Sequence, residues 1–227
     1  MSALGLQRAM GFGSYHTAWE WLHRMRQAMV MPGRERLSGE VQVDETYLGG
    51  VKAGKRGRGA AGKSLVLITA EIRGQRIGRI RLQAIPDASA GTLLDGVSEL
   101  VETGSDVVTD GLASYVCLPE RGYNHVIARH TPELGRNLLP KAHRVASLLK
   151  RWILGTHQGS IGKEHLQTYL DEFVFRFNRR TSRSRGLLFY RLLQQAVSHS
   201  PVSKRQLNQR PMASGQNSIS GPEVFGS

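Results

Sequence analysis

Asp44 carries the clearest chemical signal in this chain, because it lies in a run that is otherwise typical of a buried strand. Val41 and Val43 alternate with Gln42 and Asp44, and side chains alternate between the two faces of a strand. A carboxylate inside a sheet is costly unless it is paired or binds a metal. The run therefore favours a catalytic metal site, although a strand-end cap at Asp44 or Glu45, beside the following Tyr-Leu-Gly-Gly turn, fits the same residues.

Asp110 stands in a matching context. The run 106–109 is rich in β-branched residues and is followed by Asp110 and Gly111. In open α/β sheets, residues at the carboxyl ends of strands line the site, and Mg²⁺ takes oxygen ligands from one or two carboxylates while keeping several waters. Asp44 and Asp110 are therefore a candidate pair of metal ligands. An ordinary Asp-Gly turn is the alternative for Asp110.

The composition indicates a polyanionic partner. The chain has 227 residues, with 31 Lys and Arg against 18 Asp and Glu, a formal charge of +13 and a pI of about 10.6. Basic side chains bind phosphates and release counterions from nucleic acid, so nucleic acid is the expected partner, with a basic surface that has no specific partner as the alternative. The length suits one domain of ordinary size with small appendages.

Cys117 is the single cysteine, which excludes an intrachain disulfide and a Cys-x-x-Cys zinc module. The sequence contains no apolar run approaching the ~20 residues that cross a bilayer, and its N-terminus has no signal-peptide pattern. We therefore expect a soluble, cytoplasmic (nucleoid-associated) protein with no membrane partner.

The candidate ligands need secondary structure to position them, and the chain begins with helices. Residues 2–30 predict two short helices around Gly11–Gly13, with Ser14 as the N-cap of the second. Apolar residues recur from Tyr15 to Met29 at helical spacing and predict a buried stripe. The unit has the size of a helix-turn-helix that inserts into DNA, although a plain helical hairpin on the main domain fits it as well.

A sheet is predicted for the middle of the chain. After the strand with Asp44, strand-like runs cover 64–71 and 78–85 around a turn at 73–75, which predicts a hairpin. A helix over 89–101 leads into the strand before Asp110, and 125–128 predicts a fifth short strand. The expected order is three strands, helix, strand, helix, strand and then helices.

A helix beginning at Pro140 brings two further polar candidates. Its apolar residues from Val145 to Ile153 form one stripe, while His143, Ala146, Ser147 and Lys150 fall on the opposite face. His143 and Lys150 are two turns apart and align along that face. The face either borders a site or is simply solvated.

Two basic regions are candidates for phosphate contacts without base reading. Residues 51–63 contain no acid and predict a mobile loop. A second helix over 163–178 has its aromatic residues in the core, and no acid occurs from Phe173 to Pro222. The candidate DNA-binding residues are Lys52, Lys55, Arg56 and Arg58 in the loop and Arg179, Arg180 and Arg183 after the helix.

These features together closely resemble the insertion-sequence DDE transposases with the ISXO-like transposase domain. The motifs that carry the resemblance are Val-Asp-Glu-Thr-Tyr-Leu-Gly-Gly at 43–50, Thr-Asp-Gly at 109–111 and the stretch from His165 to Arg180. The resemblance implies an α/β fold with a ribonuclease H-like mixed sheet flanked by helices, and a small N-terminal helical segment. It also implies two-metal phosphoryl transfer on DNA ends.

The resemblance also implies the site residues. Asp44 and Asp110 match the first two acids of the catalytic triad. In most relatives the third member lies seven residues before a Lys on the helix after the sheet, and that register falls on His143 and Lys150. We therefore predict Asp44, Asp110 and His143 as ligands of two divalent ions, Mg²⁺ or Mn²⁺, and Lys150 as a phosphate contact.

His143 departs from the usual Glu or Asn of the family. A neutral imidazole ligates metals but adds no negative charge, so the second metal site would be weaker or would favour Mn²⁺. The acids that could stand in for His143 are Glu164, Asp171 and Glu172. Of these, Glu172 fits better as the partner of an arginine.

We interpret the chain as a DNA transposase catalytic domain that cleaves insertion-element ends and joins them to target DNA, working as a homo-oligomer on DNA. The expected division is a helical segment over 1–36, a ribonuclease H-like catalytic domain over 37–199 and a disordered tail over 200–227. A nuclease or resolvase of the same fold and an inactive DNA-binding remnant are the alternatives. Relatives usually carry a zinc ribbon before the helical segment, so we expect a truncated copy with impaired end recognition.

Overall fold

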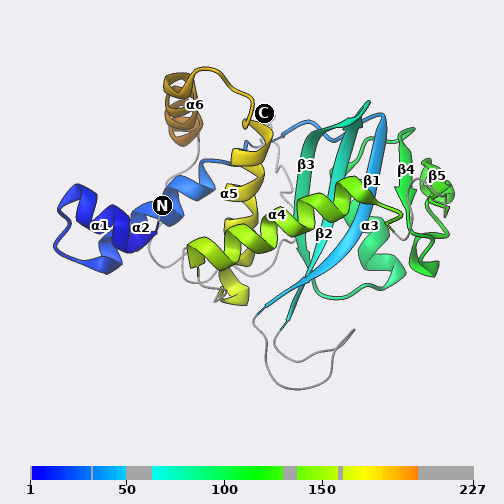
Figure 1. Cartoon of the computed structure of the whole chain (residues 1–227), viewed down its shortest axis with the longest axis horizontal. Coiled ribbons are helices and arrows are strands. Elements are labelled where there is room, and N and C mark those ends of the chain that lie inside the picture. The colour runs from blue at the N-terminus through cyan, green and yellow to red at the C-terminus, as the bar shows by residue number, and fades with distance from the viewer. Residues whose placement is uncertain (1, 32, 50–62, 130–136, 158–160, 199–227) are drawn as a thin grey trace, which may run out of the picture.

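A mixed sheet forms the centre of the protein (Figure 1). The computed structural model describes residues 2–31, 33–49, 63–129, 137–157 and 161–198. In these residues five strands lie in the order β3-β2-β1-β4-β5. The β1–β2 and β2–β3 pairs are antiparallel, and the β1–β4 and β4–β5 pairs are parallel. The strands are β1 (Glu40–Leu48), β2 (Ser64–Arg73), β3 (Arg76–Ile85), β4 (Asp106–Thr109) and β5 (Asn124–Ile127).

Helices cover both faces of the sheet, and in Figure 1 α4 crosses in front of β2 and β1. Val66 and Ile68 of β2 pack under α4 and α5, whereas the alternate residues Leu65 and Leu67 pack under α3. This is the two-residue period that a strand requires. The α-helices are α1 (Ala3–Met10), α2 (Tyr15–Gln27), α3 (Ala90–Leu100), α4 (Pro140–His157), α5 (Leu166–Asn178) and α6 (Arg185–Ser198). The predicted ribonuclease H-like α/β fold is confirmed.

The hairpin of β2 and β3 follows from its sequence. The apolar and β-branched residues of β2 suit a pleated surface, and β2 is buried continuously from Leu65 to Glu71 because helices cover both of its faces. Gly74 has a φ of 57°, the left-handed conformation that the tight turn requires. The predicted hairpin is therefore confirmed, with β2 and β3 each reaching closer to the turn than expected.

The prediction of a helix between the fourth and fifth strands is wrong. Between β4 and β5 the chain forms two single 3-10 turns, η1 (Ala113–Tyr115) and η2 (Pro119–Arg121). Pro119 lacks an N–H, and Gly122 ends η2 with a φ of 81°, so the segment cannot continue as an α-helix. Tyr115 and Leu118 are fully buried and join the core under α3.

The N-terminal helices are confirmed, and the predicted stripe of α2 is buried at Ala18 and partly buried from Trp19 to Met29, but it fails at Tyr15 and omits two buried polar residues. Ser14 caps α2, because its Oγ accepts from the His16 backbone N–H at 3.2 Å. Tyr15 is 54% exposed, although it belongs to the predicted apolar stripe, whereas the polar His23 and Arg26 are buried. The sequence pattern missed Arg26 because its partner Glu172 lies 146 residues further along the chain.

An ion pair buried between α2 and α5 explains the burial of Arg26. Its Nε lies 2.6 Å from Oε2 of Glu172, and Arg176 of α5 contacts the other carboxylate oxygen at 2.8 Å. The Arg26 guanidinium also lies over the Tyr169 ring, 4.6 Å from its centroid. A buried charge is tolerated only with such partners, so Glu172 holds arginines, as the sequence suggested.

Some sequence predictions fall on residues whose structure is not described. The loop candidates Lys52, Lys55, Arg56 and Arg58 and the tail 200–227 lie outside the described residues. Within the described part of the chain, no helix combines the length and apolar character needed to cross a bilayer.

His23 makes the docking of α2 sensitive to acid. Its ring lies between Trp19, at 4.0 Å between centroids, and His165, at 4.8 Å. The pKa of His23 is lowered from 6.5 to about 3, mainly by burial and in addition by the neighbouring Arg26, while Glu172 raises it. The folded protein therefore keeps this imidazole neutral at a pH where an unfolded chain protonates it.

We predict that the free energy of unfolding falls as the pH drops below ~6.5, since the unfolded chain then binds a proton that folded His23 excludes. One such histidine contributes up to about 1.4 kcal/mol per pH unit. His23→Gln loses this contribution at acid pH, so its stability should depend less steeply on pH. Urea denaturation at several pH values measures the slope, and equal slopes for both proteins would show that His23 is not responsible.

Candidate active site

Parallel pairing of β1 with β4 brings Asp44 and Asp110 together. The register pairs Gln42 with Val108, so two residues further along both strands Asp44 stands level with Asp110. Asp110 follows the last residue of β4 and is exposed to solvent. The negative charge of Asp110 contributes to a raised pKa at Asp44, which places the two carboxylates in one electrostatic environment.

Asp44 is a largely buried carboxylate, with 13% of its side chain exposed. Burial raises the pKa of Asp44 above its ordinary value, and Asp110 adds to that effect. His143, the Glu45 backbone N–H and Lys150 oppose it, and the N–H donates to Oδ1 at 2.9 Å. A desolvated carboxylate next to a second one attracts a cation.

His143 reaches Asp44 from the first turns of α4. Its Nε2 lies 3.2 Å from Oδ2 of Asp44, and Nδ1 hydrogen-bonds with Oδ1 of Asn137. Lys150, two turns further along the exposed face, acts electrostatically on the same carboxylate. The structure therefore brings Asp44, Asp110, His143 and Lys150 into one region.

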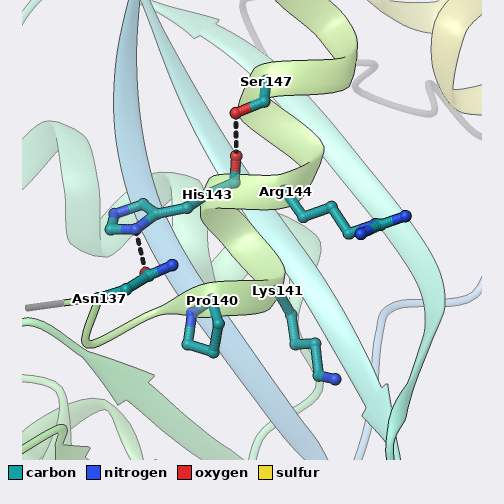
Figure 2. Close-up of a pocket in the computed structure, with 6 residues that line it drawn as sticks. All are labelled: Asn137, Pro140, Lys141, His143, Arg144 and Ser147. Atoms are coloured by element: carbon teal, nitrogen blue, oxygen red, sulfur yellow. Dashed lines mark hydrogen bonds between the residues drawn. The ribbon is translucent and has the colours of Figure 1, made fainter. Parts of the chain in front are cut away.

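The start of α4 forms a surface pocket of about 370 Å³ beside His143. Figure 2 shows its residues on the outer face of the helix, with His143 and Asn137 turned to one side and Arg144 to the other. The helix contributes no acid to its first turn. The pocket is lined by Asn137, Pro140, Lys141, His143, Arg144 and Ser147, so it suits an anionic group.

Gln42 explains why α4 begins where it does. Its side-chain Oε1 accepts from the backbone N–H groups of Lys141, at 3.0 Å, and Ala142, at 3.2 Å. These are two of the N–H groups that the first turn of a helix leaves without a partner. Gln42 lies on the same face of β1 as Asp44, two residues earlier, so one strand fixes both the carboxylate and the helix that carries His143.

Sequence reasoning gave Gln42 no role. The available signal was a polar residue at a position of the strand that should be buried, next to the candidate ligand. Its partners are backbone groups 99 and 100 residues away, and no sequence pattern identifies them.

The loop at Asp110 forms a turn and also carries a candidate metal ligand. Asp110 Oδ1 accepts from the Leu112 N–H at 3.0 Å, and Gly111 has a φ of 84°. Thr109 is fully buried, and its hydroxyl lies 2.8 Å from Nε2 of His125 on β5. The Asp-Gly turn is therefore present, and the same turn holds the Asp110 carboxylate at the end of β4.

Glu45 faces the opposite side of β1 from Asp44. Burial raises its pKa, Asp44 raises it further, and the Tyr115 hydroxyl lowers it. This second acid of the Asp-Glu pair belongs to the layer between the sheet and α3, where Tyr115 packs. Its place on the other face separates it from His143 and α4.

Two of the three acids considered as substitutes for His143 have other partners. Asp171 accepts from the Gln167 amide at 3.1 Å and lies 3.8 Å from Arg34. Glu172 holds Arg26 and Arg176. Glu164 is exposed in the 3-10 turn η3 (Lys163–His165) that precedes α5.

The donor atoms fit a hard divalent cation. Asp44 and Asp110 supply carboxylate oxygens, and His143 presents an imidazole nitrogen to Asp44. Among the described residues, no group of three or more His, Cys, Asp or Glu side chains is placed where it could hold a metal ion. Mg²⁺ is usually bound through one or two carboxylates together with waters and substrate phosphates rather than by an all-protein cage, and the carboxylate pair matches that mode.

Two of the predicted DNA-binding arginines have structural partners. Arg180 donates to the carbonyls of Ile77 and Gly78 on β3, and its guanidinium lies 4.0 Å from the Phe177 ring centroid. The Arg179 guanidinium lies 3.9 Å from the Phe175 ring centroid. Both side chains fasten the end of α5, and phosphate binding by these two and by Arg183 remains a prediction.

The ribonuclease H-like sheet carries Asp44 within β1 and Asp110 directly after the parallel neighbour β4, an arrangement consistent with the class of DDE-type transposase domains. The family model described as the ISXO2-like transposase domain matches residues 36–178, more than half of the chain, and the chain belongs to this family. The match spans the sheet, α4 and α5, and so includes Asp44, Asp110, His143 and Lys150. No curated protein matches the chain.

We predict that Gln42→Met lowers the free energy of unfolding by about 1–3 kcal/mol, because two buried N–H groups of α4 lose their acceptor without a large change of volume. Chemical denaturation measures the change. Gln75→Met, at the exposed hairpin turn, is the matched control and should stay within about 0.5 kcal/mol of the wild type. A small effect at Gln42 would mean that this tether is not needed for α4.

Proposed function

We propose that the chain is the catalytic domain of a DNA transposase that cleaves the phosphodiester at insertion-element ends and joins the freed 3′-hydroxyl to target DNA. The observation that carries the proposal is the arrangement around Asp44: a desolvated carboxylate on β1, a second carboxylate at the end of β4 and His143 at 3.2 Å. Family membership supports the same reaction class.

Each side chain has a separate task in this proposal. Asp44, Asp110 and His143 would hold divalent ions, Mg²⁺ or Mn²⁺, beside the carboxyl end of β4. When bound, such ions activate the attacking oxygen and stabilise the leaving oxygen of an in-line displacement. Asp110 is exposed and Asp44 largely buried, so the substrate phosphate would approach from the Asp110 side. Lys150 would neutralise charge on a phosphate next to the reacting one.

The pocket at the start of α4 extends the site toward DNA. Lys141 and Arg144 add positive charge there, although the Lys141 ammonium donates to the Gln75 carbonyl at 2.5 Å. Arg144 therefore has the better side chain for a strand that leaves the carboxylate pair. The overall charge of +13 favours DNA in the same way.

We predict that Asp44→Asn or Asp110→Asn reduces both cleavage and strand transfer to background while leaving DNA affinity in metal-free buffer nearly unchanged. Each change removes an anionic metal ligand and preserves volume. The assay uses labelled element-end DNA with Mg²⁺ or Mn²⁺. Asp106→Asn is the matched control, since Asp106 is an exposed carboxylate on β4 that pairs with Asn124, and it should keep full activity.

The same assay separates the alternatives. Hydrolysis without joining would indicate a nuclease or resolvase of this fold, because the fold itself does not choose between water and a 3′-hydroxyl. DNA binding without any metal-dependent nicking would indicate an inactive remnant. Cleavage that survives in both Asp variants would remove the carboxylate pair from the mechanism.

We predict that Arg144→Gln weakens binding to all DNA sequences alike and lowers the slope of log affinity against log salt by ~0.9, the value for one lost phosphate contact. Fluorescence anisotropy over a series of salt concentrations measures the slope. Arg121→Gln is the matched control, because Arg121 is exposed but pairs with Asp95 at 3.1 Å on the α3 side. Equal slopes for Arg144→Gln and wild type would place the DNA elsewhere.

A further inference from the structure

The two ring nitrogens of His143 have different partners. The partner of Nδ1 is not one of the predicted site residues. Nδ1 hydrogen-bonds with Oδ1 of Asn137, as Figure 2 shows. Nε2 lies 3.2 Å from Oδ2 of Asp44. Asn137 therefore contacts the imidazole on the side away from Asp44.

The partner of Nδ1 decides where the ring carries its hydrogen. A side-chain amide oxygen only accepts hydrogen bonds, so Nδ1 must donate to Asn137, and a neutral imidazole has one N–H. The protonated ring donates from both nitrogens and, as a cation, lowers the pKa of Asp44, whereas the neutral ring that a metal requires presents an Nε2 lone pair toward Asp44. An ionised carboxylate also only accepts hydrogen bonds. The lone pairs of Nε2 and of the Asp44 oxygen therefore face each other, and this contact is favourable when both atoms bind the same cation.

The segment that follows Asn137 is anchored to the core and to β1. Leu139, two residues later, is buried in the core under α4, and its carbonyl accepts from the His143 N–H at 2.9 Å. Pro140 begins the helix, and Gln42 holds its next two N–H groups. Asn137 thus enters the site from a short segment whose following residues are anchored at both the core and the helix.

We propose that Asn137 is a positioning residue that holds His143 in the Nδ1–H tautomer and so makes His143 Nε2 and Asp44 a joint ligand pair for a divalent ion. The inference rests on the proposed function, since it concerns the metal of that reaction. Metal-binding histidines commonly donate their second N–H to such a partner, and loss of the partner typically costs 10–100-fold in metal affinity. The imidazole in the pair shifts preference from Mg²⁺ toward Mn²⁺.

The first test measures Mn²⁺ affinity of the full chain without DNA, by electron paramagnetic resonance titration. Asn137→Ala should bind Mn²⁺ about 10-fold or more weakly, whereas Asn137→Asp keeps an acceptor for Nδ1 and should retain the affinity. Ser147→Ala is the matched control, because the Ser147 hydroxyl donates to the His143 carbonyl and not to the ring. It should bind as the wild type does.

The second test reads the tautomer directly. Long-range ¹H–¹⁵N spectra of the Mg²⁺-loaded chain at about pH 8, where a free imidazole is neutral, should show hydrogen on Nδ1 of His143 in the wild type and in Asn137→Asp. Hydrogen on Nε2 in the wild type would overturn the inference, since His143 would then donate an ordinary hydrogen bond to Asp44. Wild-type Mn²⁺ affinity in Asn137→Ala would overturn it as well.

The role of Asn137 and the metal site of the proposed function can be tested separately. If Asp44→Asn and Asp110→Asn abolish Mn²⁺ binding but Asn137→Ala does not, the metal site stands and only the role of Asn137 is lost. If Asp44→Asn and Asp110→Asn also bind Mn²⁺ as tightly as the wild type, the metal site of the proposed function is itself wrong.

Discussion

Parallel pairing of β1 with β4 is the constraint on which the site depends. The register that sets Gln42 beside Val108 also sets Asp44 level with Asp110, and no local turn or helix could bring together residues 66 positions apart. β4 has only four residues, so its pairing with β1 and β5 is what holds it in the sheet. The two carboxylates therefore come together only when the central strands are assembled. The helices then add His143 and Lys150 beside them.

The same face of β1 then recruits α4. Gln42 accepts two N–H groups from the helix, and Asp44 contacts His143 one turn into it. Burial of Asp44 is unfavourable for its charged form, and His143 and Lys150, both from α4, offset part of that cost. Strand and helix are thus joined by the Gln42 cap of the helix backbone and by the contact of Asp44 with His143.

The charged residues of α2 and α5 have structural rather than catalytic partners. Glu172 is buried with Arg26 and Arg176, and the Arg179 and Arg180 guanidinium groups stack on aromatic rings at the end of the same helix. These charges connect α2, α5 and β3 and contribute to architecture. The basic side chains of this protein therefore have two roles. Some arginines hold helices in place, whereas others, such as Arg144, line an open pocket.

The sequence by itself determined the elements with strong local signals. The period-two run around Asp44, the hairpin at Gly74, the Ser14 cap and the helix from Pro140 are all encoded within a few residues, because propensity, capping and turn chemistry are local. The short strand ending at Asp110 could be read in the same way, and so could the alignment of His143 with Lys150. A local pattern failed where Pro119 and Gly122 stopped a helix that periodicity would have allowed between β4 and β5.

Only the tertiary structure decided which polar residues meet. Gln42 and the pair Arg26–Glu172 have partners that depend on how strands and helices pack, and the hydrogen bonds of Gln42 join residues about a hundred positions apart. A sequence shows that a polar residue stands at a buried position, but the group that satisfies it is fixed by the sheet register and by the placement of α2 and α4. For that reason Asp44 was recognisable from its neighbours, whereas the residues that place His143 against it were not.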